Sequence, residues 1–225
     1  MHGAIYPVNE LFYTIQGEAT YTGYPSVFIR LQGCNVGCPW CDTKHTWDSG
    51  NAISIQDMLN KDIDSNLYAP MSAREILEVV KELGAKRVVI TGGEPCMHDL
   101  EPLTTLLATS DIQAQIETSG TEPIRCDPRT WVTVSPKIGM PGQKTPLFSS
   151  VTRANEIKMP VGKMDDLIKL QELLDTMFTK RGYSIPPVWL QPLSQGKKAT
   201  SLCIEAAKVN NWRVSIQTHK YIGVR

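Results

Sequence analysis

Short apolar runs alternate with amphipathic segments along most of the chain. The apolar runs predict strands over residues 26–32, 86–91, 113–118, 131–135, 155–159, 188–191 and 212–218. The amphipathic segments predict helices over residues 54–60, 72–83, 99–109, 165–178 and 199–209. Residues 47–70 are otherwise polar and irregular, and residues 142–150 read as a mobile loop.

This alternation predicts a parallel α/β sheet with crossover helices. A complete eight-stranded barrel takes about 250 residues. The chain has 225 residues and about seven predicted strands, some joined without a clear helix. We therefore expect an incomplete, open TIM-type β/α barrel in one domain, residues 1–225.

Polar and glycine-containing clusters follow the predicted strands. They include Gly33 with its neighbouring cysteines, 91–95 (TGGEP), 117–120 (ETSG), 135–137 (SPK), 191–194 (QPLS) and 217–220 (QTHK). In parallel α/β sheets the active site lies at the carboxyl ends of the strands. We therefore expect these clusters to meet on one rim.

Three thiols stand close together in the loop after the first predicted strand. Cys34, Cys38 and Cys41 have C-x3-C-x2-C spacing, which favours a soft metal or an iron–sulfur cluster. Three thiolates would leave one iron of a four-iron cluster free to bind a small molecule. His45 offers the alternative of a Cys₃His zinc site. The remaining thiols, Cys96, Cys126 and Cys203, are expected to be buried or incidental.

Composition excludes several classes of protein. Lys+Arg and Asp+Glu are both 23, so the net charge is zero and no large nucleic-acid footprint is expected. No apolar run approaches the roughly 20 residues of a membrane span, and the N-terminal residues do not resemble a signal peptide. We expect a cytoplasmic protein that binds neither nucleic acid nor membrane.

Further rim residues have both a chemical and a structural interpretation. Asp42 and Thr43 offer hard oxygen ligands that suit Mg²⁺, although a turn or a helix cap is favoured on the residues alone. Arg30 could clamp a carboxylate or form a surface ion pair. Glu117 could accept from a guanidine-like edge, and His219 could relay a proton or be structural.

Two more strand-end residues suggest ligand contacts. Glu94 could accept hydrogen bonds from a cationic amine, and Lys137 offers a fixed cation. The two glycines before Glu94 would let the backbone approach a ligand closely.

The cysteine spacing and the Gly-Gly-Glu-Pro run together resemble the radical S-adenosylmethionine superfamily. Within it, the chain resembles the 7-carboxy-7-deazaguanine synthase family over nearly its whole length. The motifs that carry this resemblance are N-E-x-F-x-T-I-Q-G-E (9–18), R-L-Q-G-C (30–34), C-D-T-K-H-T-W (41–47), V-I-T-G-G-E-P-C (89–96), I-E-T-S-G-T (116–121), V-S-P-K (134–137), L-Q-P-L-S (190–194) and Q-T-H-K-Y (217–221).

The resemblance implies a lyase-type ring contraction. Cys34, Cys38 and Cys41 would hold a [4Fe–4S] cluster whose fourth iron binds S-adenosylmethionine. A 5′-deoxyadenosyl radical would then abstract hydrogen from 6-carboxy-5,6,7,8-tetrahydropterin. The product would be 7-carboxy-7-deazaguanine with loss of ammonia, in the pathway to queuosine.

The resemblance also implies residue roles. Those expected to contact S-adenosylmethionine are Trp40, Cys41, Asp42, Gly93, Ser135, Pro136, Lys137, Gln191, Pro192, Leu193 and Ser194. Those expected to contact the pterin are Ile15, Gln16, Gly17, Arg30, Thr91, Glu117 and His219. Thr43 would ligate Mg²⁺, which reverses the preference from the residues alone.

The expected partners are a flavodoxin or ferredoxin as electron donor and a second copy of the chain in a homodimer. Two rival interpretations stay open at this stage. One is another radical S-adenosylmethionine enzyme, such as a glycyl-radical activase, and the other is a zinc-stabilised binding module without catalysis.

Overall fold

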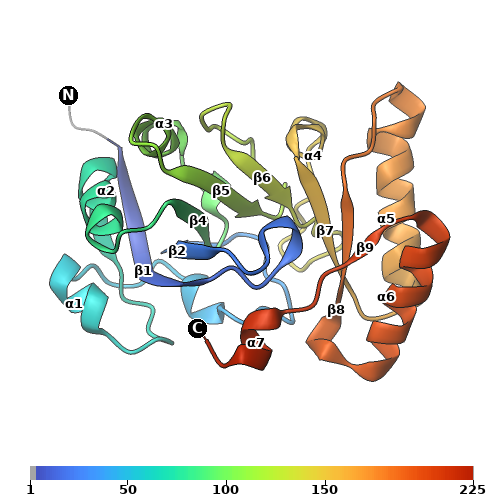
Figure 1. Cartoon of the computed structure of the whole chain (residues 1–225), viewed down its shortest axis with the longest axis horizontal. Coiled ribbons are helices and arrows are strands. Elements are labelled where there is room, and N and C mark those ends of the chain that lie inside the picture. Colours follow the sequence, from blue (N-terminus) through green and yellow to red (C-terminus); the bar gives the residue numbers. More distant parts are fainter. Residues whose placement is uncertain (1–3, 225) are drawn as a thin grey trace.

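The structure is a computed structural model that describes residues 4–224. Within that range a single sheet has nine strands in the order β3-β1-β2-β4-β5-β6-β7-β8-β9 (Figure 1). The strands are β1 (Ile5–Ile15), β2 (Pro25–Leu31), β3 (Ala69–Ser72), β4 (Arg87–Gly92), β5 (Gln113–Thr118), β6 (Trp131–Val134), β7 (Glu156–Val161), β8 (Val188–Pro192) and β9 (Arg213–Val214).

Strand β2 and strands β4 to β9 pair with their neighbours in parallel. Strands β1 and β3 extend the sheet beyond β2, and both of their pairings are antiparallel. Strands β3 and β9 are the two edges of the sheet, so the barrel does not close by strand pairing. The expected open β/α barrel is confirmed.

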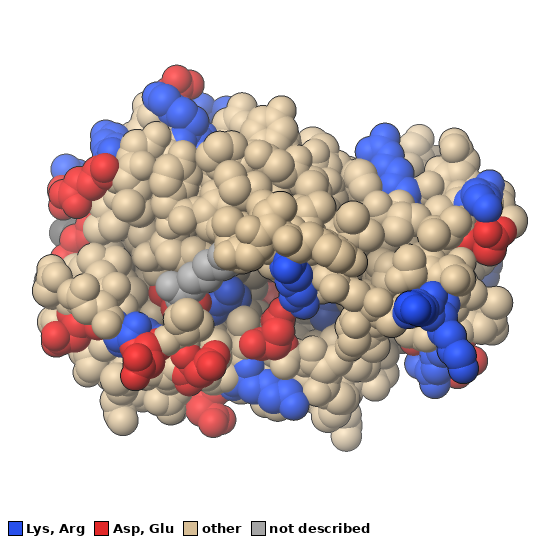
Figure 2. Space-filling model, turned by 60° about the horizontal axis from the view of Figure 1, so that its bottom comes forward, with Lys and Arg blue, Asp and Glu red and all other residues tan. Residues whose placement is uncertain are grey.

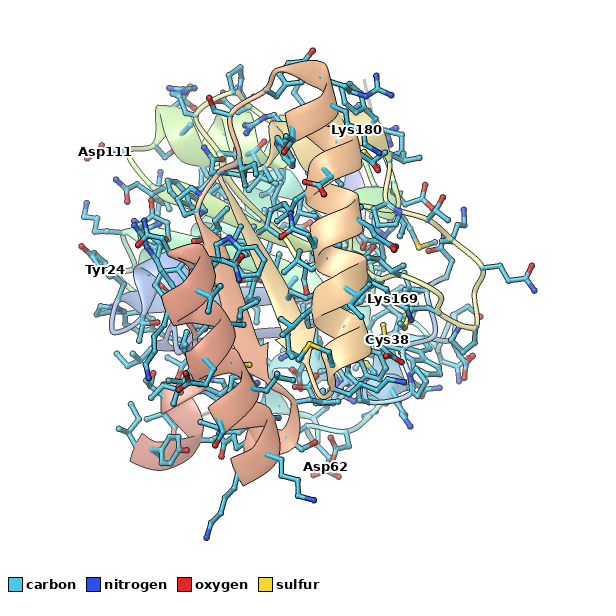
Figure 3. All side chains as sticks on the ribbon, turned by 90° about the vertical axis from the view of Figure 1, so that its right-hand side faces the viewer. Tyr24, Cys38, Asp62, Asp111, Lys169 and Lys180 are labelled. Atoms are coloured by element: carbon cyan, nitrogen blue, oxygen red, sulfur yellow. The ribbon has the colours of Figure 1, made fainter. Side chains whose placement is uncertain are left out.

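Seven α-helices lie within residues 4–224; the first six come between strands and pack on the outer face of the sheet, whereas the last follows β9 and lies apart from them (Figure 1). They are α1 (Ile55–Asn60), α2 (Ala73–Glu82), α3 (Glu101–Thr109), α4 (Phe148–Arg153), α5 (Met164–Met177), α6 (Lys197–Asn210) and α7 (Thr218–Ile222). Helix α2 begins with the expected capping box between Ser72 and Glu75. Helices α5 and α6 lie side by side outside β7 and β8 (Figure 3).

The apolar core consists of two clusters on either side of the sheet's midpoint. One joins β1 to β5 with α1, α2 and α3, and the other joins β6 to β8 with α4, α5 and α6. Ile124 and Cys126 pack against both clusters. None of the helices within residues 4–224 is long and apolar enough to cross a membrane.

Strand β1, the first strand along the chain, does not appear among the predicted elements. Its centre carries Asn9 and Glu10, which break the apolar pattern although both are buried. The Asn9 amide donates to Gln32 Oε1 at 2.6 Å, and Glu10 accepts from Arg30 Nε at 2.8 Å. Because these side chains have partners on neighbouring segments, they can be buried in a strand that the apolar pattern alone does not predict.

Other boundaries differ from expectation. The region predicted to be irregular ends in strand β3, and the predicted loop over residues 142–150 becomes helix α4 at Phe148. The predicted strand over residues 212–218 is short, because only Arg213 and Val214 pair with β8. Its last residue, Thr218, starts α7 instead.

Residues 16–21, called the crossing segment here, connect the two halves of the open barrel, whose edge strands do not pair with each other. They follow β1 and end in the 3-10 turn Ala19–Tyr21. Ala19 N–H donates to Ser215 Oγ at 2.9 Å, and Thr20 Oγ1 donates to Glu156 Oε2 at 2.5 Å. Polar contacts therefore join the β1 side of the sheet to β7 and the segment after β9.

Candidate functional site

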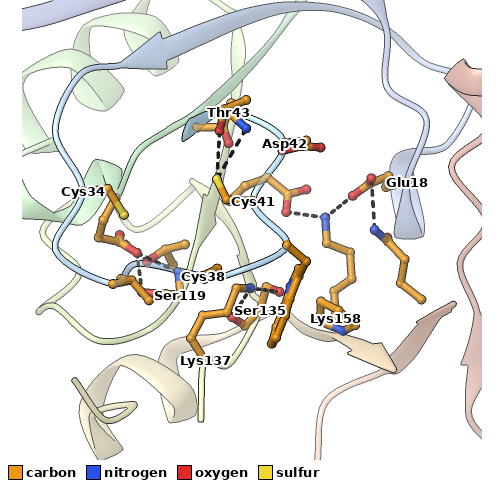
Figure 4. Close-up of a pocket in the computed structure, with 18 of the residues that line it drawn as sticks. Glu18, Cys34, Cys38, Cys41, Asp42, Thr43, Ser119, Ser135, Lys137 and Lys158 are labelled. Atoms are coloured by element: carbon orange, nitrogen blue, oxygen red, sulfur yellow. Dashed lines mark hydrogen bonds and ion pairs between the residues drawn. The ribbon is translucent and has the colours of Figure 1, made fainter. Parts of the chain in front are cut away.

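The carboxyl ends of the parallel strands surround a cavity of about 290 Å³. The three thiols Cys34, Cys38 and Cys41 line its wall and lie along one loop after β2 (Figure 4). The face at the bottom of Figure 1 shows acidic and basic side chains interspersed around a recess (Figure 2). The expected convergence of strand ends on one rim is therefore observed.

Close approach of Gly93 to the cysteine loop fixes that loop's position. A Cβ on Gly93 would stand 1.9 Å from the Gly33 carbonyl oxygen and 3.1 Å from Cys34 Cβ. The Gly93 N–H donates to the Leu31 carbonyl and the Glu94 N–H to the Gly33 carbonyl, each at 2.9 Å. The end of β4 therefore lies directly against the residues that place the first thiol.

Glu94 ties the end of β4 to the end of β5. Its carboxylate accepts from Cys96 N–H at 3.0 Å, Thr118 Oγ1 at 2.6 Å and Ser119 N–H at 2.8 Å, and also from the Ser119 hydroxyl. Both carboxylate oxygens are occupied by the chain's own donors. The expectation that Glu94 accepts from a cationic amine is thus not supported, and the buried carboxylate holds the rim together.

The residues expected to contact S-adenosylmethionine gather around the first cavity. Its lining includes Trp40, Cys41, Asp42, Gly93, Ser135, Lys137, Gln191, Pro192, Leu193 and Ser194. Pro136 is buried beside them but does not line the cavity. Lys137 Nζ donates to the Ser135 carbonyl at 2.9 Å and its hydroxyl at 2.6 Å. Burial lowers the pKa of Lys137, partly opposed by the nearby Cys38 thiol.

A second cavity of about 190 Å³ lies on the β1 side of the first. Its lining includes six of the seven residues expected to contact the pterin, namely Ile15, Gln16, Arg30, Thr91, Glu117 and His219. The seventh, Gly17, lies behind His219, since a Cβ there would stand 2.1 Å from His219 Nδ1. The Thr218 N–H donates to the Gly17 carbonyl at 3.0 Å and holds α7 in this position.

Arg30 and His219 both line the second cavity, Arg30 as a paired cation and His219 as a neutral imidazole. Glu10 accepts from Arg30 Nε at 2.8 Å, and the Glu10 side chain is only 5% exposed. This contact orients a guanidinium whose chemistry suits a carboxylate ligand. Burial lowers the pKa of His219 despite the opposing charge of Glu18, so its imidazole is neutral at pH 7.

Two carboxylates and one ammonium stand where the two cavities meet. Glu18, Glu117 and Lys158 line both cavities. Lys158 Nζ donates to Glu117 Oε2 at 2.6 Å and also to Glu18 (Figure 4). Burial raises the pKa of Glu117, and the Glu18 charge adds to that effect. Lys158, with the amide of Gln217, outweighs burial at Glu18 and lowers its pKa.

The thiol loop suits an iron–sulfur cluster better than a single zinc ion. Among residues 4–224, no three His, Cys, Asp or Glu side chains converge closely enough to ligate one metal ion. A cluster does not require that convergence, because each thiolate binds a different iron. His45, the proposed fourth zinc ligand, does not line the cavity and has its Nδ1 3.8 Å from Asp64.

The turn after Cys41 places oxygen ligands beside sulfur. Thr43 Oγ1 lies 3.5 Å from Cys41 Sγ, and Thr43 N–H donates to the same sulfur at 3.4 Å. Thr43 lines the first cavity, and Asp42 lines both. These donors fit a Mg²⁺ ion that keeps waters and takes further oxygens from a substrate.

Two residues at or near the cavities, Lys158 and Glu10, were not expected from the sequence to have a function. Lys158 lies between Ile157 and Met159 in a short apolar strand, and a charged residue in such a strand was its signal. Glu10 falls within the motif over residues 9–18, but its role was not predicted, because that role depends on Arg30 across the β1–β2 pair.

Comparison with known proteins gives concordant matches. The Radical SAM superfamily model matches residues 28–128. The 7-carboxy-7-deazaguanine synthase of Escherichia coli strain K12 is 51% identical over 97% of this chain and 99% of its own. That of Buchnera aphidicola is 46% identical over 98% of this chain and 99% of its own. A crystal structure of QueE from Escherichia coli superposes with a TM-score of 0.89 at 50% identity, covering 95% of this chain and 94% of that one.

Proposed function

The chain belongs to the 7-carboxy-7-deazaguanine synthase family of radical S-adenosylmethionine enzymes, and from that membership we propose its substrate and the roles of its residues. It converts 6-carboxy-5,6,7,8-tetrahydropterin to 7-carboxy-7-deazaguanine with loss of ammonia, a step of queuosine biosynthesis. The observation that carries this proposal is the pair of joined cavities, one lined by the thiols and the other by residues suited to a small pterin.

The first cavity is the proposed site of the [4Fe–4S] cluster and S-adenosylmethionine. When bound, these groups supply one-electron chemistry and a radical that removes hydrogen from the substrate. Cys34, Cys38 and Cys41 are the proposed cluster ligands. Burial raises the pKa of the Cys34 and Cys38 thiols, so metal binding there displaces protons. The strand-end residues of β4, β6 and β8 line this cavity and would limit the contact of a bound cofactor with water.

The second cavity is the proposed pterin site. Arg30, already oriented by Glu10, binds the substrate carboxylate. Glu117 faces the N–H edge of the pterin's aminopyrimidinone ring, and neutral His219 closes the cavity from the α7 side. Asp42 lines both cavities and Thr43 lines the first, and a Mg²⁺ ion held by Thr43 would also bind the substrate carboxylate.

Cavity size favours this function over protein activation. A glycyl-radical activase must admit a polypeptide loop, whereas the second cavity holds about 190 Å³ and lies behind α7 and the crossing segment. Anaerobic reaction of the tetrahydropterin with reductant, S-adenosylmethionine and Mg²⁺ should give 7-carboxy-7-deazaguanine and ammonia. A protein that cleaves S-adenosylmethionine yet forms no deazaguanine would exclude the proposal.

The Mg²⁺ assignment has its own test. Thr43→Ala should keep its iron and sulfide content but lose the stimulation of turnover by Mg²⁺. Thr179→Ala, an exposed threonine on a turn after α5, is the matched control and should respond as wild type does. Retained Mg²⁺ stimulation in Thr43→Ala would remove Thr43 from the site.

The electron donor, assembly and location complete the proposal. A one-electron donor of the flavodoxin or ferredoxin type is required by the chemistry, and the family suggests a homodimer in the cytoplasm. Sedimentation equilibrium tests the homodimer directly. Turnover supported by a purified flavodoxin or ferredoxin, compared with a chemical reductant, tests the donor.

A further inference from the structure

Lys158 is the cation at the centre of the junction between the two cavities. It comes from β7, and its side chain is 7% exposed. It donates to Glu117 from β5 and to Glu18, the residue just before the 3-10 turn of the crossing segment. These two carboxylates take two of the three N–H donors of the ammonium and balance its charge in a buried position.

The two carboxylates have different remaining partners. Glu18 Oε1 accepts from Gln217 Nε2 at 2.8 Å and from Gln191 Nε2 at 3.2 Å. Glu117 Oε1 accepts from Gln115 Nε2 at 3.1 Å and only distantly, at 3.5 Å, from Gln16 Nε2. Both carboxylates are therefore held on both oxygens, but Glu117 has one partner fewer within 3.2 Å than Glu18 and lines the second cavity.

The charge count also separates Lys158 from an ordinary structural ion pair. When both carboxylates are ionised, they and the ammonium carry one net negative charge, although burial raises the pKa of Glu117 to about 7. That charge suits a ligand edge that presents several N–H donors, as an aminopyrimidinone ring does. Removal of the ammonium would leave two negative groups facing each other, and burial would then favour protonation of Glu117.

We propose that Lys158 is a positioning residue for the pterin site: it fixes Glu117 toward the second cavity and, through Glu18, ties it to Gln217 at the start of α7. The inference rests on the proposed function. Gln217 precedes the helix that carries His219, and its side chain also accepts from Lys220 Nζ at 2.7 Å. One lysine thus sets the relative position of groups from β5, the crossing segment and α7.

The test compares three variants by the KM for the tetrahydropterin, kcat, iron content and S-adenosylmethionine affinity. Lys158→Met should raise the pterin KM at least about tenfold, as loss of one partner of a buried charged pair does. Its iron content should match wild type, and its S-adenosylmethionine affinity should change less than its pterin KM, although Lys158 also lines the first cavity. Lys163→Met, an exposed lysine paired with Asp165 at the start of α5, is the matched control and should change nothing.

The third variant removes the neighbouring charge that favours protonation of Glu117 when Lys158 is lost. Lys158→Met combined with Glu18→Gln should let Glu117 ionise more readily than in Lys158→Met, so its pterin KM should fall below that of Lys158→Met. A lysine needed only for stability would give no such recovery. If Lys158→Met does not fold, Glu18→Gln alone carries the test, and it should raise the pterin KM while the cluster is retained.

Opposite results would overturn the inference. A pterin KM in Lys158→Met equal to that of wild type would do so, as would a parallel loss of iron and S-adenosylmethionine binding. In the fallback case, an unchanged KM in Glu18→Gln has the same meaning. A wild-type protein that forms no deazaguanine would overturn the proposed function as well, whereas active wild type with an unaffected Lys158→Met would overturn this inference alone.

Discussion

Substitution of Gly93 by alanine should dislodge the cysteine loop. A Cβ on this residue would stand 1.9 Å from the Gly33 carbonyl oxygen and 2.5 Å from its carbon, both backbone atoms. Because real Cβ contacts are essentially never shorter than 3.0 Å, the carbonyl would have to move by at least 1.1 Å. No flexible side chain can absorb this movement, so the backbone of one strand end must shift.

The energetic cost follows from that shift. Overpacking of this kind costs about 1–3 kcal/mol. The shift also lengthens two backbone hydrogen bonds, from Gly93 to Leu31 and from Glu94 to Gly33, each worth about 1 kcal/mol. A total of about 3–5 kcal/mol would lower the Tm of a chain of this size by roughly 6–20 °C. Since Gly33 precedes Cys34, the same movement should displace the first thiol.

The assay measures iron and sulfide content after anaerobic reconstitution, together with the Tm of the protein. We expect Gly93→Ala to bind markedly less iron than wild type and to lose S-adenosylmethionine cleavage in proportion. Gly196→Ala is the control, since its Cβ would meet only the Leu193 carbonyl at 3.6 Å and its φ of −65° suits any residue. Full iron content with an unchanged Tm in Gly93→Ala would refute the packing argument.

Three further predictions concern the second cavity and its surroundings. Gly17→Ala should push His219 and α7 outward, because its Cβ would stand 2.1 Å from His219 Nδ1, and should raise the pterin KM without changing iron content. Glu10→Ala removes a charge-assisted hydrogen bond to Arg30 worth about 1.5–3 kcal/mol, so steady-state kinetics should show a pterin KM higher by about 10- to 100-fold. Burial lowers the pKa of His98 and His219 below 6.5, so unfolding takes up protons as the pH falls through 6.5. Burial raises the pKa of Glu117 to about 7, and this opposes the histidines as the pH falls below 7. Urea titrations should therefore show stability falling more steeply below pH 6.5 in wild type than in His98→Gln, by up to about 1.4 kcal/mol per pH unit, and equal slopes would contradict this.

The parallel part of the fold follows from local sequence patterns. Runs such as residues 86–91 are rich in β-branched residues and are followed by a glycine pair, and the alternation of strands with helices predicts a parallel sheet. The strand ends then had to share one rim, which is why both predicted ligand sets gather around two adjoining cavities. Residue roles within those cavities came from motif resemblance, since spacing alone left zinc and iron–sulfur sites open.

The features that the sequence did not predict depend on contacts between residues that are distant along the chain. Strand β1 is interrupted by Asn9 and Glu10, whose partners Gln32 and Arg30 lie on the neighbouring strand. Lys158 reads locally as one charge in an apolar strand, and only the fold brings Glu18 and Glu117 to it. The short β9 and the helix after it depend likewise on contacts with the crossing segment.

The crossing segment also sets the order in which this molecule can be completed during synthesis. Ala19 bonds to Ser215 and Gly17 accepts from Thr218, at sequence separations of 196 and 201 residues. On the ribosome the early residues must wait for nearly the entire sheet before these partners emerge. Such non-local contacts slow folding, because a long loop must close before they form. A nascent chain that already carries its three thiols therefore still lacks the wall that separates substrate from solvent.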